Sequence, residues 1–452
     1  MPEIDLQNPH RLPPQNIEAE KAVLGSLMLN KEAISQIADL LKPEDFYRST
    51  HGIIYQSILS LYNKSEPIDL ISLTNHLQDQ GRLDEIGGVS YITNLTQSTP
   101  TAAHITHYAQ IVRRKKILRD LINTAIEITE LSYQKSDNIE NLLDQVEQKI
   151  FAISQRSISY DFIPVKSVLE EAFERIDQLQ QNKEHIRGVP TGFTDLDNIL
   201  SGLQPSDLII LAARPSMGKS SLSLDIARYV GIKEKTPVAI FSLEMSKQDL
   251  IDRLIAAESN VNLWKLRTGR LSADGPDNDF ERIQEALSSL SESLIFIDDN
   301  PSPTVLQMKT MSRRLQAKHR LGLIIIDYLQ LIQPSSSSDS RVQQVSEISR
   351  ALKGLSRELN VPVLALSQLS RAIESRPDQY PRLADLRESG SIEQDADVVV
   401  FIYREDKVKK NSSRPNIADI IISKHRNGPL GKIELFFDES HTSFKNLERR
   451  IE

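Results

Sequence analysis

The chain has 452 residues, more than one ordinary hydrophobic core can organise, so two or three domains are predicted. Hydrophobic residues make up 39% and charged residues 26% of the sequence, and no apolar run approaches the roughly 20 residues that span a bilayer. The lack of cysteine excludes disulfides and thiolate metal sites. A net charge of −8 argues against a surface coated with nucleic acid, so we expect any DNA to bind in a local channel.

Residues 1–155 are predicted to form an all-α domain. Apolar residues recur at helical spacing in IEAEKAVLGSLML (17–29), in HGIIYQSILSLY (51–62) and in NIENLLDQVEQKIFAIS (138–154). Alternation typical of strands is hard to find in this block. The N-terminus also lacks the basic and then apolar order of a secretory signal, which favours a cytoplasmic protein without a membrane anchor.

Residues 156–187 are predicted to be a linker that contains one amphipathic helix. RSISYDFIPV (156–165) loses the helical period and contains Pro164. The apolar residues of the following VKSVLEEAFERIDQLQQ share one helix face: Val165, Val168, Leu169, Phe173, Ile176 and Leu179. That face must be covered either by the same chain or by a neighbouring copy.

Residues 188–452 are predicted to form an α/β domain with a mostly parallel sheet. Short Val, Ile and Leu runs alternate with helical patterns, as expected for strands that crossover helices bury on both faces. The runs are DLIILAA, PVAIFSL, SLIFIDD, LGLIIIDYLQLI, VPVLALSQ, ADVVVFIYR and ADIIISKHR. The serine run Ser335–Ser338 between two of them is interpreted as a solvated loop.

ARPSMGKS (213–220) matches the phosphate-binding pattern G-x-x-x-x-G-K-[ST] except at its first position. Ala213 stands where a glycine is usual, at little cost if its φ is negative, because only a left-handed conformation demands glycine. An apolar strand precedes the stretch and a helical pattern follows it, which is the order that a P-loop needs. Lys219 is expected to contact the β and γ phosphates of ATP, and Ser220 to bind Mg²⁺. The residues predicted to bind the nucleotide are Ala213, Arg214, Pro215, Ser216, Met217, Gly218, Lys219, Ser220 and Ser221.

Three strand ends offer the other groups that ATP hydrolysis requires. Asp327 ends an apolar strand, where a buried acid needs a cation or a hydrogen bond, so it is a second candidate for Mg²⁺. Glu244 in FSLEM is a candidate to orient the attacking water, and Gln368 in VPVLALSQ could sense the γ-phosphate.

Six stretches, in order and spacing, resemble the motif set of the DnaB family of replicative DNA helicases. They are ARPSMGKS, SLEM, IIIDYLQLI, LSQLSR, DLRESGSIEQDAD and SKHRNGP. LPPQNIEAEKAVLGSLML is similar to the helical N-terminal domain of that family, and the P-loop of the family also carries alanine at its first position. The resemblance therefore accounts for Ala213 and covers both predicted domains.

The resemblance implies a RecA-like P-loop ATPase that forms a homohexameric ring and moves 5′ to 3′ on single-stranded DNA. By this resemblance Glu244 is the catalytic carboxylate, Asp327 the Walker B acid and Gln368 the γ-phosphate sensor. Lys424 and Arg426 match the pair that one subunit inserts into the site of its neighbour.

The resemblance also implies macromolecular partners. Arg387, Glu388 and Gly390 match the segment that contacts the DNA backbone, and residues 1–155 match a collar that binds primase. A helicase loader or initiator is a further expected partner. A strand-exchange ATPase of the RecA type and a ring scaffold without motor activity stay open as alternatives, as does an organelle stroma in place of a bacterial cytoplasm.

Overall fold

The computed structural model describes most of the chain. The described residues are 12–97, 99, 101–133, 164–169, 186–273, 278–334, 340–376, 379–409 and 412–447, with single residues and pairs between 139 and 177. The predicted linker segment 156–163 and the serine run Ser335–Ser338 lie outside them. The chain divides into two compact units, Met1–Leu169 and Glu170–Glu452.

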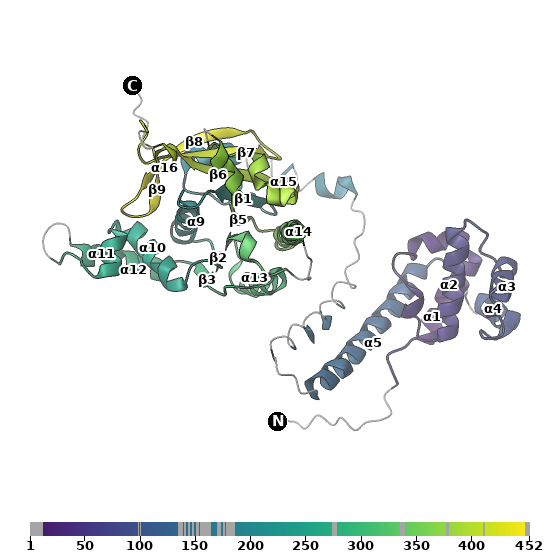
Figure 1. Ribbon diagram of the computed structural model, residues 1–452. Helices are drawn as coiled ribbons and strands as arrows, with labels where there is room; N and C mark the ends of the chain where they lie inside the picture. The colour runs from purple at the N-terminus through teal and green to yellow at the C-terminus, as the bar shows by residue number, and fades with distance from the viewer. Residues whose placement is uncertain are drawn as a thin grey trace. The chain divides into compact units, whose positions relative to one another are not determined.

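Helices are the only regular elements among the described residues of the N-terminal unit, as predicted (Figure 1). Its α-helices are α1 (Ile17–Leu29), α2 (Ser49–Asn63), α3 (Leu70–Asp79), α4 (Gly88–Gln97) and α5 (Ile105–Tyr133), and short 3-10 helices span Lys31–Gln36 and Pro43–Asp45. Side-chain caps help to start the helices, since Asn16 accepts from Ala19 N and Asp69 accepts from Ser72 N. The inward stripes of α1 and α2, including Val23, Leu24, Ile54 and Ile58, form one core.

The C-terminal unit is built on one sheet of nine strands among its described residues. The strands are β1 (Leu208–Ala213), β2 (Val238–Ser242), β3 (Ile295–Asp298), β4 (Leu323–Asp327), β5 (Val363–Gln368), β6 (Val398–Arg404), β7 (Ile417–His425), β8 (Gly431–Asp438) and β9 (Ser443–Asn446). Their order in the sheet is β3-β2-β4-β5-β1-β6-β7-β8-β9. In this order, each strand from β3 to β6 is parallel to the next one. The pairs β6-β7, β7-β8 and β8-β9 are antiparallel.

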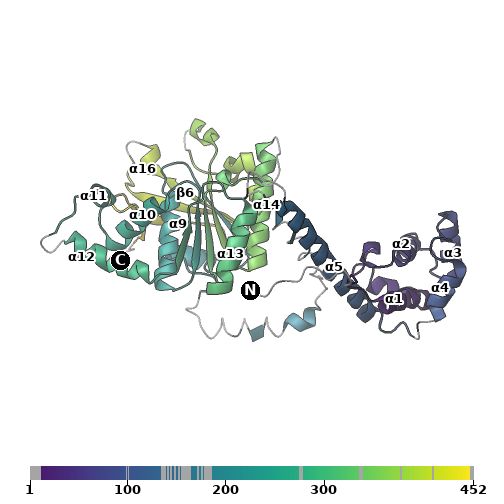
Figure 2. The same cartoon turned by 90° about the horizontal axis from the view of Figure 1, so that it is seen from below.

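Helices cover both faces of this sheet (Figure 2). The α-helices from Thr194 to Leu359 are, in chain order, α8 (Thr194–Leu200), α9 (Lys219–Arg228), α10 (Lys247–Ser259), α11 (Leu263–Thr268), α12 (Asp279–Ser291), α13 (Val305–His319) and α14 (Arg341–Leu359). The other helical pieces are α15 (Gly390–Asp395), α16 (Glu405–Val408), η3 (Tyr229–Lys233), η4 (Leu329–Leu331), η5 (Arg371–Ser375) and η6 (Leu383–Ser389). Side chains of α8, α9 and α10 pack on one face, and those of α13 and α14 on the other. The predicted α/β fold with a mostly parallel sheet is therefore confirmed.

All seven apolar runs that were predicted as strands form β1 to β7. The prediction missed β8 and β9, which complete the antiparallel end of the sheet. In β8 buried residues alternate with more exposed ones, so this strand lacks the continuous apolar run that marks the parallel strands.

Candidate functional site

The P-loop lies between β1 and α9, and its backbone explains its sequence. Ala213 is the last residue of β1 and does not have a positive φ, so this position does not require glycine. Gly218 has φ 99°, and a Cβ there would lie 2.8 Å from Phe444 Cζ. Only glycine fits this position without moving the neighbouring ring. Lys219 then begins α9, so the positive end of the helix faces the loop.

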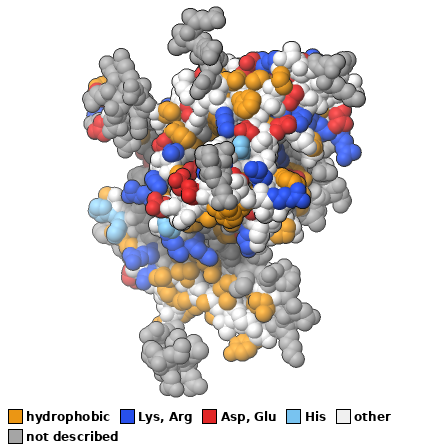
Figure 3. Space-filling model, turned by 90° about the vertical axis from the view of Figure 1, so that its left-hand side faces the viewer, with side chains coloured by type: hydrophobic (Ala, Val, Ile, Leu, Met, Phe, Trp, Pro, Cys, Tyr) orange, Lys and Arg blue, Asp and Glu red, His pale blue; other side chains and the backbone are white. Residues whose placement is uncertain are grey.

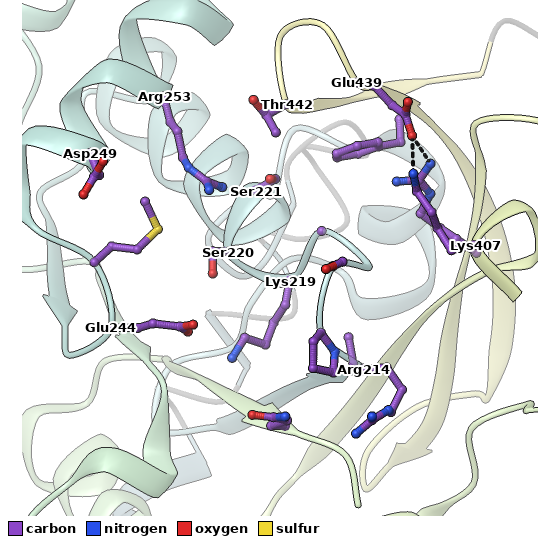
Figure 4. A pocket seen from close by; sticks show the side chains of 18 residues that line it. Arg214, Lys219, Ser220, Ser221, Glu244, Asp249, Arg253, Lys407, Glu439 and Thr442 are labelled. Carbon is purple, nitrogen blue, oxygen red and sulfur yellow. Dashed lines mark hydrogen bonds and ion pairs between the residues drawn. The ribbon is translucent and has the colours of Figure 1, made fainter. Parts of the chain in front are cut away.

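A pocket of 680 Å³ opens over the P-loop (Figure 4). Its volume lies in the range of sites that bind nucleotides and molecules of similar size. The predicted site residues that line it are Ala213, Arg214, Pro215, Ser216, Gly218, Lys219, Ser220, Ser221, Glu244 and Gln368. The side chain of Met217 instead packs in the core beneath the loop.

Asp327 is not among the residues that line the pocket, but it contacts Lys219, which is. Lys219 Nζ lies 3.3 Å from Asp327 Oδ1 and 4.2 Å from the centre of the Tyr328 ring. Asp327 is buried, yet its Oδ1 accepts no hydrogen bond. A buried carboxylate oxygen that contacts an ammonium but accepts no hydrogen bond among the described residues fits a position suited to a cation. No cluster of three or more His, Asp or Glu side chains suited to a metal occurs in the described part of the chain.

Glu244 and Gln368 reach the same pocket from two different strands. Glu244 follows β2, is exposed, and lies on the opposite side of Lys219 from Arg214 in Figure 4. Gln368 ends β5 with its side chain exposed, while Gln330 holds its backbone by accepting from Gln368 N and donating to Gln368 O at 3.2 Å. The carboxyl-end edge of the sheet thus brings together four side chains that lie far apart in the sequence: Lys219, Glu244, Asp327 and Gln368.

Arg214 connects the P-loop to the segment after β5. Its guanidinium donates to the Leu369 carbonyl at 2.9 Å and pairs with Glu374. Burial and the nearby Arg371 lower the pKa of Arg214. Such a guanidinium stays charged, since its ordinary pKa lies far above neutrality.

The antiparallel end of the sheet supplies a wall of the pocket that the sequence analysis missed. Arg404 is fully buried, lies 4.4 Å from the Phe437 ring centre, and pairs with Glu439 at 2.9 Å. Lys407 pairs with the same glutamate at 2.7 Å (Figure 4). Thr442 closes this end, and its buried Oγ1 has no hydrogen-bond partner. The one available signal was a charged residue, Arg404, at the end of the apolar run VVVFIYR.

Arg253 of α10 is a further pocket residue that no motif indicated. Burial and the charge of Arg267 lower its pKa, while Asp327, Asp249 and Glu244 act in the opposite direction. Its side chain points toward Ser220 and Ser221 in Figure 4, so it offers a second cation to a bound phosphate chain.

Lys424 and Arg426 do not line the pocket of their own chain. Lys424 Nζ donates to the carbonyls of Glu393 and Gln394, and burial together with the adjacent Arg426 lowers the pKa of Lys424. Arg426 Nη1 lies 3.2 Å from Asp397 Oδ1, and its side chain is 58% exposed. The guanidinium is therefore accessible to another molecule.

The predicted DNA contacts lie at the junction of two short helices. The backbones of Arg387 and Glu388 belong to η6, and Gly390 begins α15. Their side chains lie outside the described part of the structure. The structure therefore locates the segment only through its backbone.

The fold and the pocket define a RecA-like P-loop ATPase with an added helical domain. A family model described as the DnaB-like helicase C terminal domain matches residues 188–446, and the DnaB-like helicase N terminal domain matches residues 12–114. The chain belongs to the DnaB family of replicative DNA helicases, which are ATP-dependent enzymes that unwind DNA. No helix among the described residues is long and apolar enough to cross a membrane.

Similar proteins cover both domains. Replicative DNA helicase DnaC of Bacillus subtilis is 49% identical over 449 residues, 99% of this chain and 98% of that protein. Replicative DNA helicase DnaB of Geobacillus stearothermophilus is 49% identical over 98% of this chain and 97% of its own. A solved structure of a DnaB-like replicative helicase and its interactions with primase has a TM-score of 0.80 at 34% identity, covering 96% of this chain and 100% of that one.

Proposed function

We propose that the protein works as a homohexameric ring that uses ATP and Mg²⁺ to move 5′ to 3′ along single-stranded DNA at a replication fork. The observation that carries the proposal is the pocket in which Lys219, Glu244 and Gln368 converge beside Asp327. The full-length relatives are replicative DNA helicases, which favours this function over a strand-exchange ATPase or a ring scaffold without motor activity. The bacterial relatives support a cytoplasmic site of action.

Each pocket residue has a role that follows from its chemistry. The P-loop backbone and Lys219 bind the phosphates, and Ser220 and Asp327 are the residues that would hold Mg²⁺, which would supply positive charge to the phosphate chain. Glu244 orients the attacking water, and Gln368 senses the γ-phosphate. Phe437 and Thr442 face the pocket from the antiparallel strands and suit the base and ribose.

Assembly into a ring is supported by groups that a single chain leaves exposed. Arg426 is accessible and is not among the residues that line the pocket of its own chain, so it and Lys424 act on nucleotide held by the next subunit. Apolar side chains of the linker helix and of α10 to α12 are also exposed: Val165, Val168, Leu169, Phe173, Ile251, Trp264, Phe280 and Leu287. Exposed apolar groups of this size are expected at interfaces between subunits.

DNA binds within the ring through the segment of Arg387, Glu388 and Gly390, at the sugar and phosphate backbone and without reading bases. Acidic and basic side chains are interspersed on the face shown in Figure 3, which suits binding confined to a channel. Residues 1–155 form a collar that docks primase, 156–187 form the linker and 188–452 form the motor. The similar solved helicase is described with its interactions with primase, which supports primase as a partner, and a loader or initiator places the ring on DNA.

A strand-displacement assay on a forked duplex tests the proposal. The full chain with ATP and Mg²⁺ should unwind a fork that has a free 5′ single strand and leave a fork with only a free 3′ strand intact. Lys219→Ala serves as the inactive control. Unwinding of the 3′ fork alone would reverse the polarity, and ATP-dependent assembly without unwinding would favour the scaffold.

A further inference from the structure

One arginine joins the P-loop to the segment that follows β5. Arg214 donates to the Leu369 carbonyl at 2.9 Å and forms an ion pair with Glu374, which lies in η5. Leu369 N donates back to the Ala213 carbonyl at 3.1 Å. The Arg214 side chain is only 14% exposed, so it has little freedom to move independently of these partners. The P-loop and η5 are therefore linked by both side-chain and backbone bonds.

The segment is joined in turn to η6. Ser370 N donates to the Asp385 carbonyl at 3.1 Å, and Arg376 pairs with the Asp385 carboxylate. That carboxylate also accepts from Arg382 N at 2.7 Å, and Asp385 is buried. These bonds fix the first turn of η6, the helix whose backbone carries Arg387, to both ends of η5.

We propose that Glu374 is a positioning residue that, by holding Arg214, couples the nucleotide pocket to the single-stranded DNA segment of η6. Glu374 is not among the residues that line the pocket, but it pairs with Arg214, which is. Movement of the P-loop around a γ-phosphate reaches η5 through this pair, and reaches η6 through the bonds of Ser370 and Arg376 with Asp385. The inference rests on the proposed function, because the pocket and the DNA segment are its two sites.

The ion pair is suited to coupling because its loss costs little stability. Glu374 is 53% exposed, and pairs of this kind contribute little to the free energy of unfolding. Coupling between two binding sites commonly changes affinity by roughly 5- to 150-fold, and it is reciprocal. ATP should therefore change the affinity for DNA by the same factor as DNA changes the affinity for ATP.

The test compares Glu374→Gln with the full-length wild type. The dissociation constant of a dT oligonucleotide is measured by fluorescence anisotropy with ADP and with a nonhydrolysable ATP analogue, and ATPase rates are measured with and without the oligonucleotide. Glu374→Gln should reduce the ratio of the two dissociation constants roughly fivefold, toward one, with a similar loss of DNA-stimulated ATPase and an unchanged basal rate.

A matched control separates coupling from charge. Removing an acid raises DNA affinity by general electrostatics, but it does so with either nucleotide and leaves the ratio unchanged. Glu358→Gln removes the same charge from a glutamate that also pairs with an arginine, Arg313, and connects α13 with α14 instead of the P-loop. This variant should keep the wild-type ratio.

The possible results test the coupling through Glu374 separately from the proposed helicase function. A wild-type ratio and stimulation in Glu374→Gln would overturn the coupling and leave the helicase proposal standing. A wild type without nucleotide-dependent DNA binding and without stimulation would overturn both. If Glu374→Gln did not fold, Arg376→Gln would break the next bond of the same path. A wild-type ratio in that variant would equally overturn the coupling.

Discussion

The parallel and antiparallel parts of the sheet contribute to the nucleotide pocket in different ways. The parallel strands β1, β2, β4 and β5 all end at one edge. Asp327 and Gln368 end β4 and β5, while Glu244 follows β2 and Lys219 begins the helix after β1. The antiparallel end supplies Phe437, Thr442 and Glu439, whose carboxylate is already paired with Arg404 and Lys407.

We therefore expect the two parts of the sheet to serve different purposes: one positions the groups for ATP hydrolysis, and the other shapes the pocket and contacts neighbouring subunits. In a parallel sheet the carboxyl ends of neighbouring strands meet, so groups distant in the sequence converge on one phosphate chain. An antiparallel strand begins where its neighbour ends, so β7 carries Lys424 and leads to Arg426 beside α15, outside the pocket. The first part should therefore govern catalysis within one chain, and the second should govern nucleotide fit and communication between chains.

Arg426 should show the largest effect, because it tests whether the antiparallel part acts on another subunit. An arginine finger supplied in trans contributes about 10³ to 10⁵ in rate by neutralising charge in the transition state. Arg426→Ala should fold and bind ATP, yet hydrolyse it at most about one thousandth as fast, by this estimate. Steady-state ATPase measurements with DNA present check this.

Mixing variants distinguishes action in trans from a structural role through Asp397. Arg426→Ala mixed with Lys219→Ala should recover part of the activity, because some interfaces then join an intact P-loop to an intact finger. If subunits demonstrably exchange and no activity returns, Arg426 acts within its own chain.

Glu244→Gln should have the next largest effect. It should lower the turnover rate about 10²- to 10⁴-fold, because the amide cannot accept a proton. Its ATP affinity should stay close to that of the wild type, since the phosphate ligands are untouched. Lys219→Ala, by contrast, should lose both affinity and turnover. Hydrolysis at the wild-type rate in the glutamine variant would reduce Glu244 to a structural acid.

The parallel part of the site could be predicted from the sequence because its strands are buried on both faces. Such strands form continuous apolar runs, and a polar residue directly after one marks the sheet edge, as Asp327 and Gln368 do. The alanine at the first P-loop position was also interpretable, because Ala213 completes β1 in extended conformation.

The antiparallel wall could not be predicted in the same way. β8 alternates buried and partly exposed residues, and the turn that carries Thr442 has no motif. The position of Phe444 against Gly218 depends on a contact between residues more than two hundred positions apart, which no local pattern contains. Arg404 was missed because a buried guanidinium is recognisable only once its partners Asp406 and Glu439 are placed.

Thr442→Val tests the wall with a smaller effect. The hydroxyl is buried without a partner, so replacing it with a methyl group of similar shape should leave the melting temperature unchanged or higher. If the hydroxyl bonds to the nucleotide, the variant should raise KM for ATP about tenfold, the equivalent of one hydrogen bond of roughly 1.4 kcal/mol, with little change in kcat. An unchanged KM would show that Thr442 contributes packing to the wall and no hydrogen bond to the nucleotide.

The smallest effect is expected where the two parts of the sheet are joined beneath the P-loop. Asp225 of α9 is buried and accepts from Phe444 N at 2.7 Å and from Ser443 Oγ at 2.9 Å, which ties β9 to the P-loop helix. Burial raises the pKa of Asp225 to about 6 from an ordinary 3.8, despite the nearby Arg228. An asparagine of the same shape can keep the bond from Phe444 N and carries no charge to bury.

The raised pKa of Asp225 fixes the sign of the pH dependence. Below pH 3.8 the carboxyl is protonated in the folded and unfolded chain alike, and between 3.8 and about 6 the folded chain binds the extra proton. The free energy of unfolding therefore falls as pH rises through this window, by at most about 3 kcal/mol for two pKa units. Asp225→Asn should remove this fall in the free energy of unfolding. Because the variant also loses the ion pair with Arg228, its net gain in the free energy of unfolding at pH 7 should be only on the order of 1 kcal/mol. Urea unfolding of the ATPase domain transition at pH 5 and pH 7 measures both quantities, and an Asn variant less stable than the wild type at pH 7 would show that the carboxylate is needed to hold β9.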